Sequence, residues 1–161
     1  MTGIARNVVR RAWDIVSNDA PTRYLIDEFR RLNSIDAHAG GKFLTVTPMS
    51  ETKVSVQGGD SGKGLELFEV RFRVQCGIEM HSTPTDLHPA EFMPDVIGVG
   101  GAVWDALQGS FLPSGGVDYC TVPCRLVTAD YSADFEPTGE GGMLWMGVAI
   151  YTCSVRVNNP T

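Results

Sequence analysis

Residues 67–76 read Leu-Phe-Glu-Val-Arg-Phe-Arg-Val-Gln-Cys, and this stretch decides the fold. Apolar and polar residues alternate along it, which is the pattern of a strand with one buried and one exposed side. The apolar side comprises Phe68, Val70, Phe72, Val74 and Cys76. The polar side comprises Glu69, Arg71, Arg73 and Gln75. The stretch therefore predicts a half-buried antiparallel strand whose charged side faces water or a partner.

Four other segments have strand composition. Residues 43–47 and 53–57 are two short runs that we expect to pair with each other, before a glycine-rich loop at 58–64. Residues 119–129 contain Pro123, which is typical of an edge strand or a bulge. Residues 143–157 are apolar through their middle, which predicts a central strand covered on both faces.

An amphipathic helix is predicted over residues 3–16. Its apolar stripe comprises Ile4, Val8, Ala12, Ile15 and Val16. Thr2 is the expected N-cap, and the run 18–21, which ends in Pro21, stops the pattern. Residues 22–34 fit a second helical face less clearly, and 24–26 alone fit a short extended segment equally well.

A central helix is predicted over residues 95–107, with Asp95 placed favourably in its first turn. Its expected apolar face comprises Val96, Ile97, Val99, Val103, Trp104 and Leu107. Gly98, Gly100 and Gly101 weaken this helix intrinsically, by about 1 kcal/mol each relative to alanine. Close packing against a sheet would explain their presence.

The order of elements is helix, strands, helix, strands, with no regular βαβ repeat, so we predict an α+β fold. We expect a mixed or antiparallel sheet of about four to five strands, flanked by the N-terminal and central helices, in a single domain spanning residues 1–161. No apolar run approaches the roughly 20 residues that span a bilayer. The first eleven residues do not resemble a signal peptide, so a cytoplasmic site of synthesis and assembly is expected.

Charge and cysteine content narrow the function classes. The net charge of −6 and pI near 4.9 leave no basic excess for neutralising phosphates, which argues against a free nucleic-acid binder. An acidic balance is compatible with a pore through which DNA slides. The four cysteines, Cys76, Cys120, Cys124 and Cys153, are expected to be reduced thiols, three of them in segments with strand composition.

Motifs for catalysis or cofactor binding are incomplete. In the run 58–64, Gln57 takes the place of the first Walker glycine and Gly64 that of the hydroxyl residue. The glycines at 98–101 lie inside a helix pattern, not at a strand-to-helix turn. Cys120 and Cys124 lack a second pair at zinc-site spacing. We therefore assign no catalytic residue, cofactor or metal.

As a whole, this layout resembles the tail-terminator (tail-completion) proteins of long-tailed bacteriophages and their relatives among head–tail connection proteins. The resemblance rests on the N-terminal helix, a strand ending in Pro48, the glycine-rich loop, the charged strand 67–77, the helix 96–107 and two long final strands. It implies a non-enzymatic virion protein that forms a hexameric ring at the head–tail junction. It also implies contacts with the tail tube protein and the head–tail connector protein, and DNA that passes through the pore without specific binding. No membrane is involved.

If this chain forms a ring, six charged residues are the expected interface. They are Glu69, Arg71 and Arg73 on the strand, and Asp134, Glu136 and Glu140 in segment 130–142, which is expected to be a projecting hairpin loop. Complementary charges of this kind fix the register of a contact more than they add affinity.

Two alternatives remain open at this point. The chain fits a neighbouring head–tail connector or minor tail protein as well as a terminator. From a different class, His81 and His88 share the proline-containing segment 79–93 with several carboxylates, which fits a small-ligand-binding, metal-binding or hydrolytic α+β domain.

Overall fold

A computed structural model describes residues 3–26, 28–30, 41–57, 65–80, 89–110, 118–137 and 143–158. The helices are α1 (Ile4–Asn18), α2 (Ala20–Leu25) and α3 (Pro89–Leu107). The strands are β1 (Glu28–Arg30), β2 (Gly41–Gln57), β3 (Leu65–Met80), β4 (Asp118–Pro137) and β5 (Met143–Asn158).

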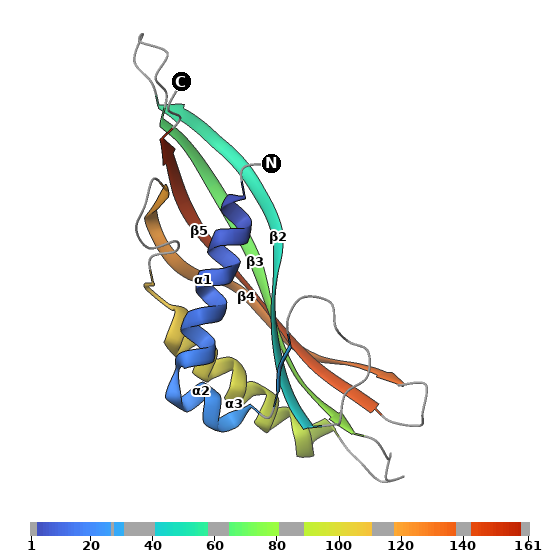
Figure 1. Cartoon of the computed structure of the whole chain (residues 1–161). Helices are drawn as coiled ribbons and strands as arrows, with labels where there is room; N and C mark the ends of the chain where they lie inside the picture. Colours follow the sequence, from blue (N-terminus) through green and yellow to red (C-terminus); the bar gives the residue numbers. More distant parts are fainter. Residues whose placement is uncertain are drawn as a thin grey trace.

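The five strands form one mixed sheet in the order β1-β2-β3-β5-β4. Only β1 is parallel to its neighbour, and the other three pairings are antiparallel. The sheet is long and twisted, and the three helices lie on one of its faces (Figure 1). This arrangement confirms the α+β prediction, the expected number of strands and the two flanking helices.

The central strand β3 confirms the alternation that predicted it. The five apolar side chains at 68–76 are buried, whereas Glu69, Arg73 and Gln75 are half-buried and Arg71 is exposed. Phe72 stacks on Tyr151 of β5 with ring centroids 5.6 Å apart, and both side chains are fully buried. This pair sits at the middle of a core that β3 and β5 share with α1 and α3.

Helix α1 buries the predicted stripe, with Ile15 half-buried and the other four members fully buried. The expected N-cap at Thr2 is wrong, because Gly3 holds that position in the left-handed region with φ 70°. The first turn is satisfied differently, since the Glu51 carboxylate of β2 accepts the Ala5 N–H at 2.9 Å. This long-range bond also fixes α1 to the sheet.

The helix favoured over 22–34 is wrong beyond residue 25. Helix α2 begins directly after α1, because the Asp19 side chain accepts both the backbone N–H and the hydroxyl of Thr22. The chain then forms β1, whose residues 28–30 pair with 43–45 of β2. Pairing with a neighbouring strand has overridden a weak local helix preference, and residues 31–34 lie outside the described ranges.

Residues 43–47 and 53–57 do not pair with each other, because both belong to the single strand β2. Proline is tolerated inside this strand for two reasons. The pairing with β3 shifts register between Pro48 and Ser50, and the pairing with β1 has already ended at Thr45. The strand therefore continues past the point where the sequence predicts its end.

The hairpin loop expected over 130–142 is wrong for residues 130–137, which continue β4 and pair with β5 at Asp130 and again from Asp134 to Pro137. Residues 138–142 lie outside the described ranges. The bulge prediction at Pro123 is confirmed, since β4 is an edge strand with register shifts on both sides of Val122. Strand β5 is central as predicted, although the described helices cover only one of its faces.

Helix α3 begins at Pro89, six residues before its predicted start at residue 95, and it continues through Pro94. Its sheet-facing side chains are Val96, Val99, Val103 and Leu107, all buried. The expectation that Ile97 and Trp104 share this face is wrong, since they are 47% and 42% exposed. The four buried side chains form the face of the helix that contacts the sheet, and Ile97 and Trp104 lie outside that face.

Only one of the three adjacent helix glycines is explained by packing. A Cβ on Gly100 would overlap the hydroxyl of Tyr131, whose ring lies between α3 and β5. Gly147 of β5 lies against the same ring, because a Cβ added there would be 2.7 Å from Tyr131 Cδ1. A Cβ on Gly98 or Gly101 would meet nothing within 4 Å.

Candidate assembly surfaces

The face of the sheet opposite the helices, here called the helix-free face, is polar and rich in arginine. Register places its side chains in cross-strand rows, such as Thr47–Arg73–Ile150–Thr128 and Ser50–Arg71–Thr152–Arg125. The charged members whose side chains the structure describes are Arg71, Arg73, Arg125, Arg156, Glu69 and Asp130. Arginine predominates in this part of the face, whereas register also places Glu79, Asp134 and Glu136 on the same face toward one end of the sheet.

Side-chain contacts on this face are local and partly incomplete. The Arg71 Nε donates to Glu69 Oε1 at 2.8 Å, with 48% and 34% of the two side chains exposed. The Arg73 Nε donates to the Thr47 hydroxyl at 3.4 Å. On the same face, the hydroxyls of Thr45, which pairs with Gln75, and of Thr152, which pairs with Arg71, are buried and have no hydrogen-bond partner within the described structure. Buried hydroxyls without a partner are uncommon in folded proteins.

The six residues predicted as an interface are not brought together within one subunit. Arg71 pairs with Thr152, whereas Asp134 pairs with Met146, which in turn is level with Gly77. The basic and acidic groups therefore occupy different parts of the sheet. Glu136 lies in β4 near its end, and Glu140 lies outside the described residues. A contact between the two sets requires a second chain.

A groove that the sequence did not reveal runs between α1 and the outer edge of β2. Its volume is about 960 Å³, and its apolar lining comprises Val9, Trp13, Pro48 and Met49. Arg6 and Arg10, which are exposed and lie one helix turn apart on α1, also line the groove.

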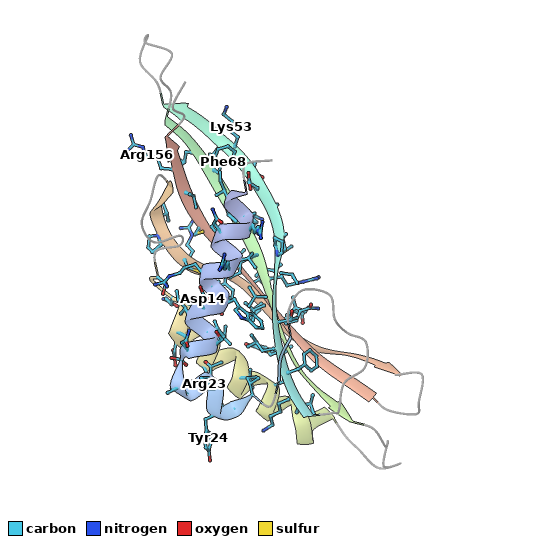
Figure 2. The ribbon with its side chains drawn as sticks, in the orientation of Figure 1. Asp14, Arg23, Tyr24, Lys53, Phe68 and Arg156 are labelled. Atoms are coloured by element: carbon cyan, nitrogen blue, oxygen red, sulfur yellow. The ribbon has the colours of Figure 1, made fainter. Side chains whose placement is uncertain are left out.

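A smaller apolar surface lies on the helices. Tyr24 of α2 is 92% exposed and projects from the end of the molecule opposite Lys53 and Arg156 (Figure 2). Ile97 and Trp104 of α3 are two turns apart and partly exposed. Scattered exposed apolar residues are normal on a protein surface, so these three define no site by themselves.

The described side chains contain little that points to catalysis. Cys76, Cys124 and Cys153 are buried and form no disulfide within the described ranges. Burial raises the pKa of the Cys76 thiol to about 12, so it is not a nucleophile near neutral pH. No group of three metal-ligating side chains occurs in the described ranges, and His81 and His88 lie outside them. No described helix has the length and apolarity needed to span a bilayer.

Comparison with known proteins identifies the fold. No family model matches the chain, and no curated protein matches it. Among solved structures, it is similar to a chain in the virion of a native gene transfer agent (GTA) particle, with a TM-score of 0.58. The match covers 99% of this chain and 100% of the other at 12% sequence identity. Over their whole lengths, the two chains share one fold.

Proposed function

We propose that this chain is a structural protein of a phage-like virion, and specifically a tail terminator that forms a ring at the end of the tail tube. The observation that carries the proposal is the end-to-end match with a chain of a gene transfer agent virion. A domain that merely shared a common motif would match only part of either chain. The order of elements that resembles tail terminators covers the same full length.

The surfaces agree with a structural role. Within the described residues, both edges of the sheet are largely unpaired, the helix-free face carries a group of arginines, and an apolar groove lies beside α1. In a ring of identical subunits, one surface of each copy contacts a different surface of its neighbour. Such head-to-tail contacts form a closed ring when the successive rotations add up to a full turn. In this proposal the ring, a hexamer, contacts the tail tube protein on one side and the head–tail connector protein on the other.

The helix-free face supplies the first proposed contact. Glu69, Arg71 and Arg73 lie on it, and Arg125 of β4 shares the row of Arg71, with Thr152 between them. We assign this face to a neighbouring copy or to the tail tube, with charge fixing the orientation of the contact. Reversing Arg71 and Arg73 to glutamate should abolish ring formation and leave a folded monomer. An intact ring in that variant would remove this face from the subunit interface.

The experiment that tests the function is the solution mass of the purified protein by light scattering, with negative-stain images. Six copies of a 17.4 kDa chain give about 104 kDa, and the expected particles are rings. Addition to purified tail tubes should place density at one end of each tube. Density along the tube wall would instead support a minor tail protein, and density only on isolated heads would support a connector. A monomer that binds neither would overturn the proposal.

A further inference from the structure

We propose that the groove between α1 and β2 is the docking site for helix α3 of a second copy of this chain. The inference rests on the proposed ring and names two surfaces that would join neighbouring subunits. Three observations carry it. The two surfaces lie on opposite sides of the helix layer, their side chains have complementary chemistry, and their lengths match.

The groove presents apolar and positively charged side chains to an occupant. Its apolar lining comprises Val9, Trp13, Pro48 and Met49. Arg6 and Arg10 line it as well, and both side chains are exposed. The two carboxylates of the lining are Asp14, at one end, and Glu51, which already accepts the Ala5 N–H. The two arginines are therefore available to the carboxylate of another chain.

The wall of the groove that β2 supplies favours a helix over an added strand. Beyond residues 43–45, no described strand pairs with the outer edge of β2. Pro48 has no backbone N–H to donate, and the register shift between Pro48 and Ser50 leaves Met49 without an opposite residue in β3. Bulges and prolines of this kind interrupt strand pairing at a sheet edge. A helix satisfies its own backbone and can bind such a groove through side chains alone.

The exposed side of α3 carries the anchors that a groove of this kind accepts. Ile97 and Trp104 lie two turns apart, and Gly101 lies between them on the same side of the helix. Helices that bind in grooves present apolar side chains at this spacing. A Cβ on Gly101 would meet nothing within 4 Å, so packing inside the subunit does not require glycine there. Close approach of a second chain would explain it.

The groove and the exposed side of α3 lie on opposite sides of the helix layer. In the sheet order β1-β2-β3-β5-β4, α1 packs over β2 and β3, whereas α3 packs over β3, β5 and β4. Gly100 lies against the ring of Tyr131 of β4. Ile97 and Trp104 are three and four residues from Gly100, so they share its side of the helix, toward β4. A contact between two such different surfaces is head-to-tail, as a ring requires.

Charge favours this combination over the pairing of like surfaces. Helix α3 contains no lysine or arginine, and Asp105, which follows Trp104, is exposed. Contact between two grooves would bring Arg6 and Arg10 of both copies together, and contact between two α3 helices would bring the aspartates together. Only the groove–α3 combination places opposite charges against each other.

The lengths of the two surfaces match. The wall of the groove on α1 runs from Gly3 to Asp14, which is about 16 Å for a helical rise of about 1.5 Å per residue. From Ile97 to Asp105, α3 covers about 12 Å by the same rise. The apolar anchors and the carboxylate of one helix can therefore contact one groove at the same time.

The first test is a charge swap across the proposed contact. One variant carries Arg6→Glu and Arg10→Glu, a second carries Asp105→Arg, and a third combines all three changes. The first two should raise the protein concentration at half-assembly by about tenfold or more, and the third should restore assembly. Arg11→Glu with Arg23→Glu is the matched control for the first variant, since both arginines are exposed, lie outside the groove lining and change the charge equally.

The second test removes the apolar anchor. Trp104→Ala should raise the protein concentration at half-assembly by about tenfold or more, because tryptophan is a frequent hot spot at the centre of a contact. Tyr24→Ala should leave assembly unchanged, since Tyr24 is an exposed aromatic residue outside both surfaces. Gly101→Ala adds a methyl group for which the subunit has room, so it should weaken assembly without lowering the stability of the monomer.

Light scattering measures assembly, negative-stain images of tube ends measure it if assembly needs the tail tube, and circular dichroism shows that each variant is folded. Rings that survive either charge reversal or Trp104→Ala would overturn this contact and leave the proposed function intact. Failure of the combined variant to reassemble, with all variants folded, would overturn the pairing of Asp105 with the groove. Groove variants that form rings but no longer bind tail tubes would overturn a second copy as the occupant. An unchanged chain that stays monomeric with and without tubes would overturn both the ring and this contact.

Discussion

The two faces of the sheet have the same strands and register but opposite chemistry. Toward the helices, the aromatic pair Phe72 and Tyr151 is completely buried and closely packed. One residue further along β3, Arg71 lies on the helix-free face with half of its side chain exposed. Folding therefore buries the apolar side chains of the first face. On the second face, charged side chains stay partly exposed and buried hydroxyls lack a hydrogen-bond partner within the described structure. This difference separates residues that stabilise the subunit from residues available for assembly.

Removing the central ring should break the covered face most severely. Phe72→Ala deletes a fully buried ring stacked at 5.6 Å on Tyr151, and large-to-small changes of this kind cost about 3–5 kcal/mol. Arg71→Ala, the neighbouring residue on the other face, removes only an exposed ion pair and should cost less than about 1 kcal/mol. Urea unfolding of both variants measures the contrast. Equal losses would show that the two faces do not differ as described.

The glycines that contact Tyr131 provide a second, smaller contrast. Gly147→Ala places a Cβ 2.7 Å from the Tyr131 ring and 3.1 Å from Val96, and such overpacking typically costs about 1–3 kcal/mol. Gly98→Ala is the control, because its Cβ meets nothing within 4 Å and alanine favours the helix by up to about 1 kcal/mol. Thermal unfolding should therefore shift in opposite directions for the two variants. A fall in melting temperature for Gly98→Ala would show that this position is already constrained.

Strand alternation explains how much of the fold could be predicted from the sequence. Residues 67–76 have a period of two that leaves no other reading, and the stripe of α1 is equally clear. Local signals failed where a distant partner decided the structure. The segment 28–30 becomes a strand only because β2 lies beside it, and Pro48 is tolerated only because a bulge and an open edge coincide there.

The candidate surfaces could be predicted less well, for a related reason. The sequence identified the charged side of β3 because alternation alone places it. The groove combines α1 with a strand about 40 residues later in the chain, and no local pattern reports that proximity. The acidic run at 130–140 was visible as a composition, yet glycine and proline nearby predicted a loop where β5 stabilises a strand.

The Cys76 thiol makes stability on the covered face depend on pH. Its pKa is raised from 9.0 to about 12, first by desolvation, while backbone hydrogen bonds at Cys76 itself and at Gly147 oppose the rise. Because the folded pKa exceeds the unfolded one, this stabilisation is complete below pH 9 and is lost as pH rises toward 12. Between pH 8 and pH 10 the loss should be about 1.4 kcal/mol.

The measurement is the free energy of unfolding at pH 8 and pH 10 for the unchanged chain and for Cys76→Ala. Alanine lowers stability at both values, but only the unchanged chain should show the additional loss at pH 10. Groups that do not interact with Cys76 affect both proteins equally, whereas the pKa values of Tyr131 and Tyr151 are raised first by burial and also by the charge of Cys76. Parallel pH dependences would mean that the thiol is already ionised, or accessible, in the folded protein.

The smallest expected effect concerns the hydroxyl of Thr152 on the helix-free face. This buried oxygen has no hydrogen-bond partner in the described structure, so Thr152→Val should raise the free energy of unfolding of the monomer by about 1 kcal/mol. Thr22→Val is the control with the opposite sign, because the Thr22 hydroxyl donates to Asp19 Oδ2 at 2.7 Å and its removal should cost about 1 kcal/mol.

The same variant also links stability to assembly. Thr152 lies between Arg71 and Arg125 in one cross-strand row, where a partner that covers the helix-free face could reach its hydroxyl. If such a partner supplies the missing hydrogen bond, Thr152→Val should stabilise the monomer and weaken the ring, as measured by unfolding and by light scattering on one sample. Stabilisation with an unchanged ring would exclude this row of the helix-free face from the contacts between copies.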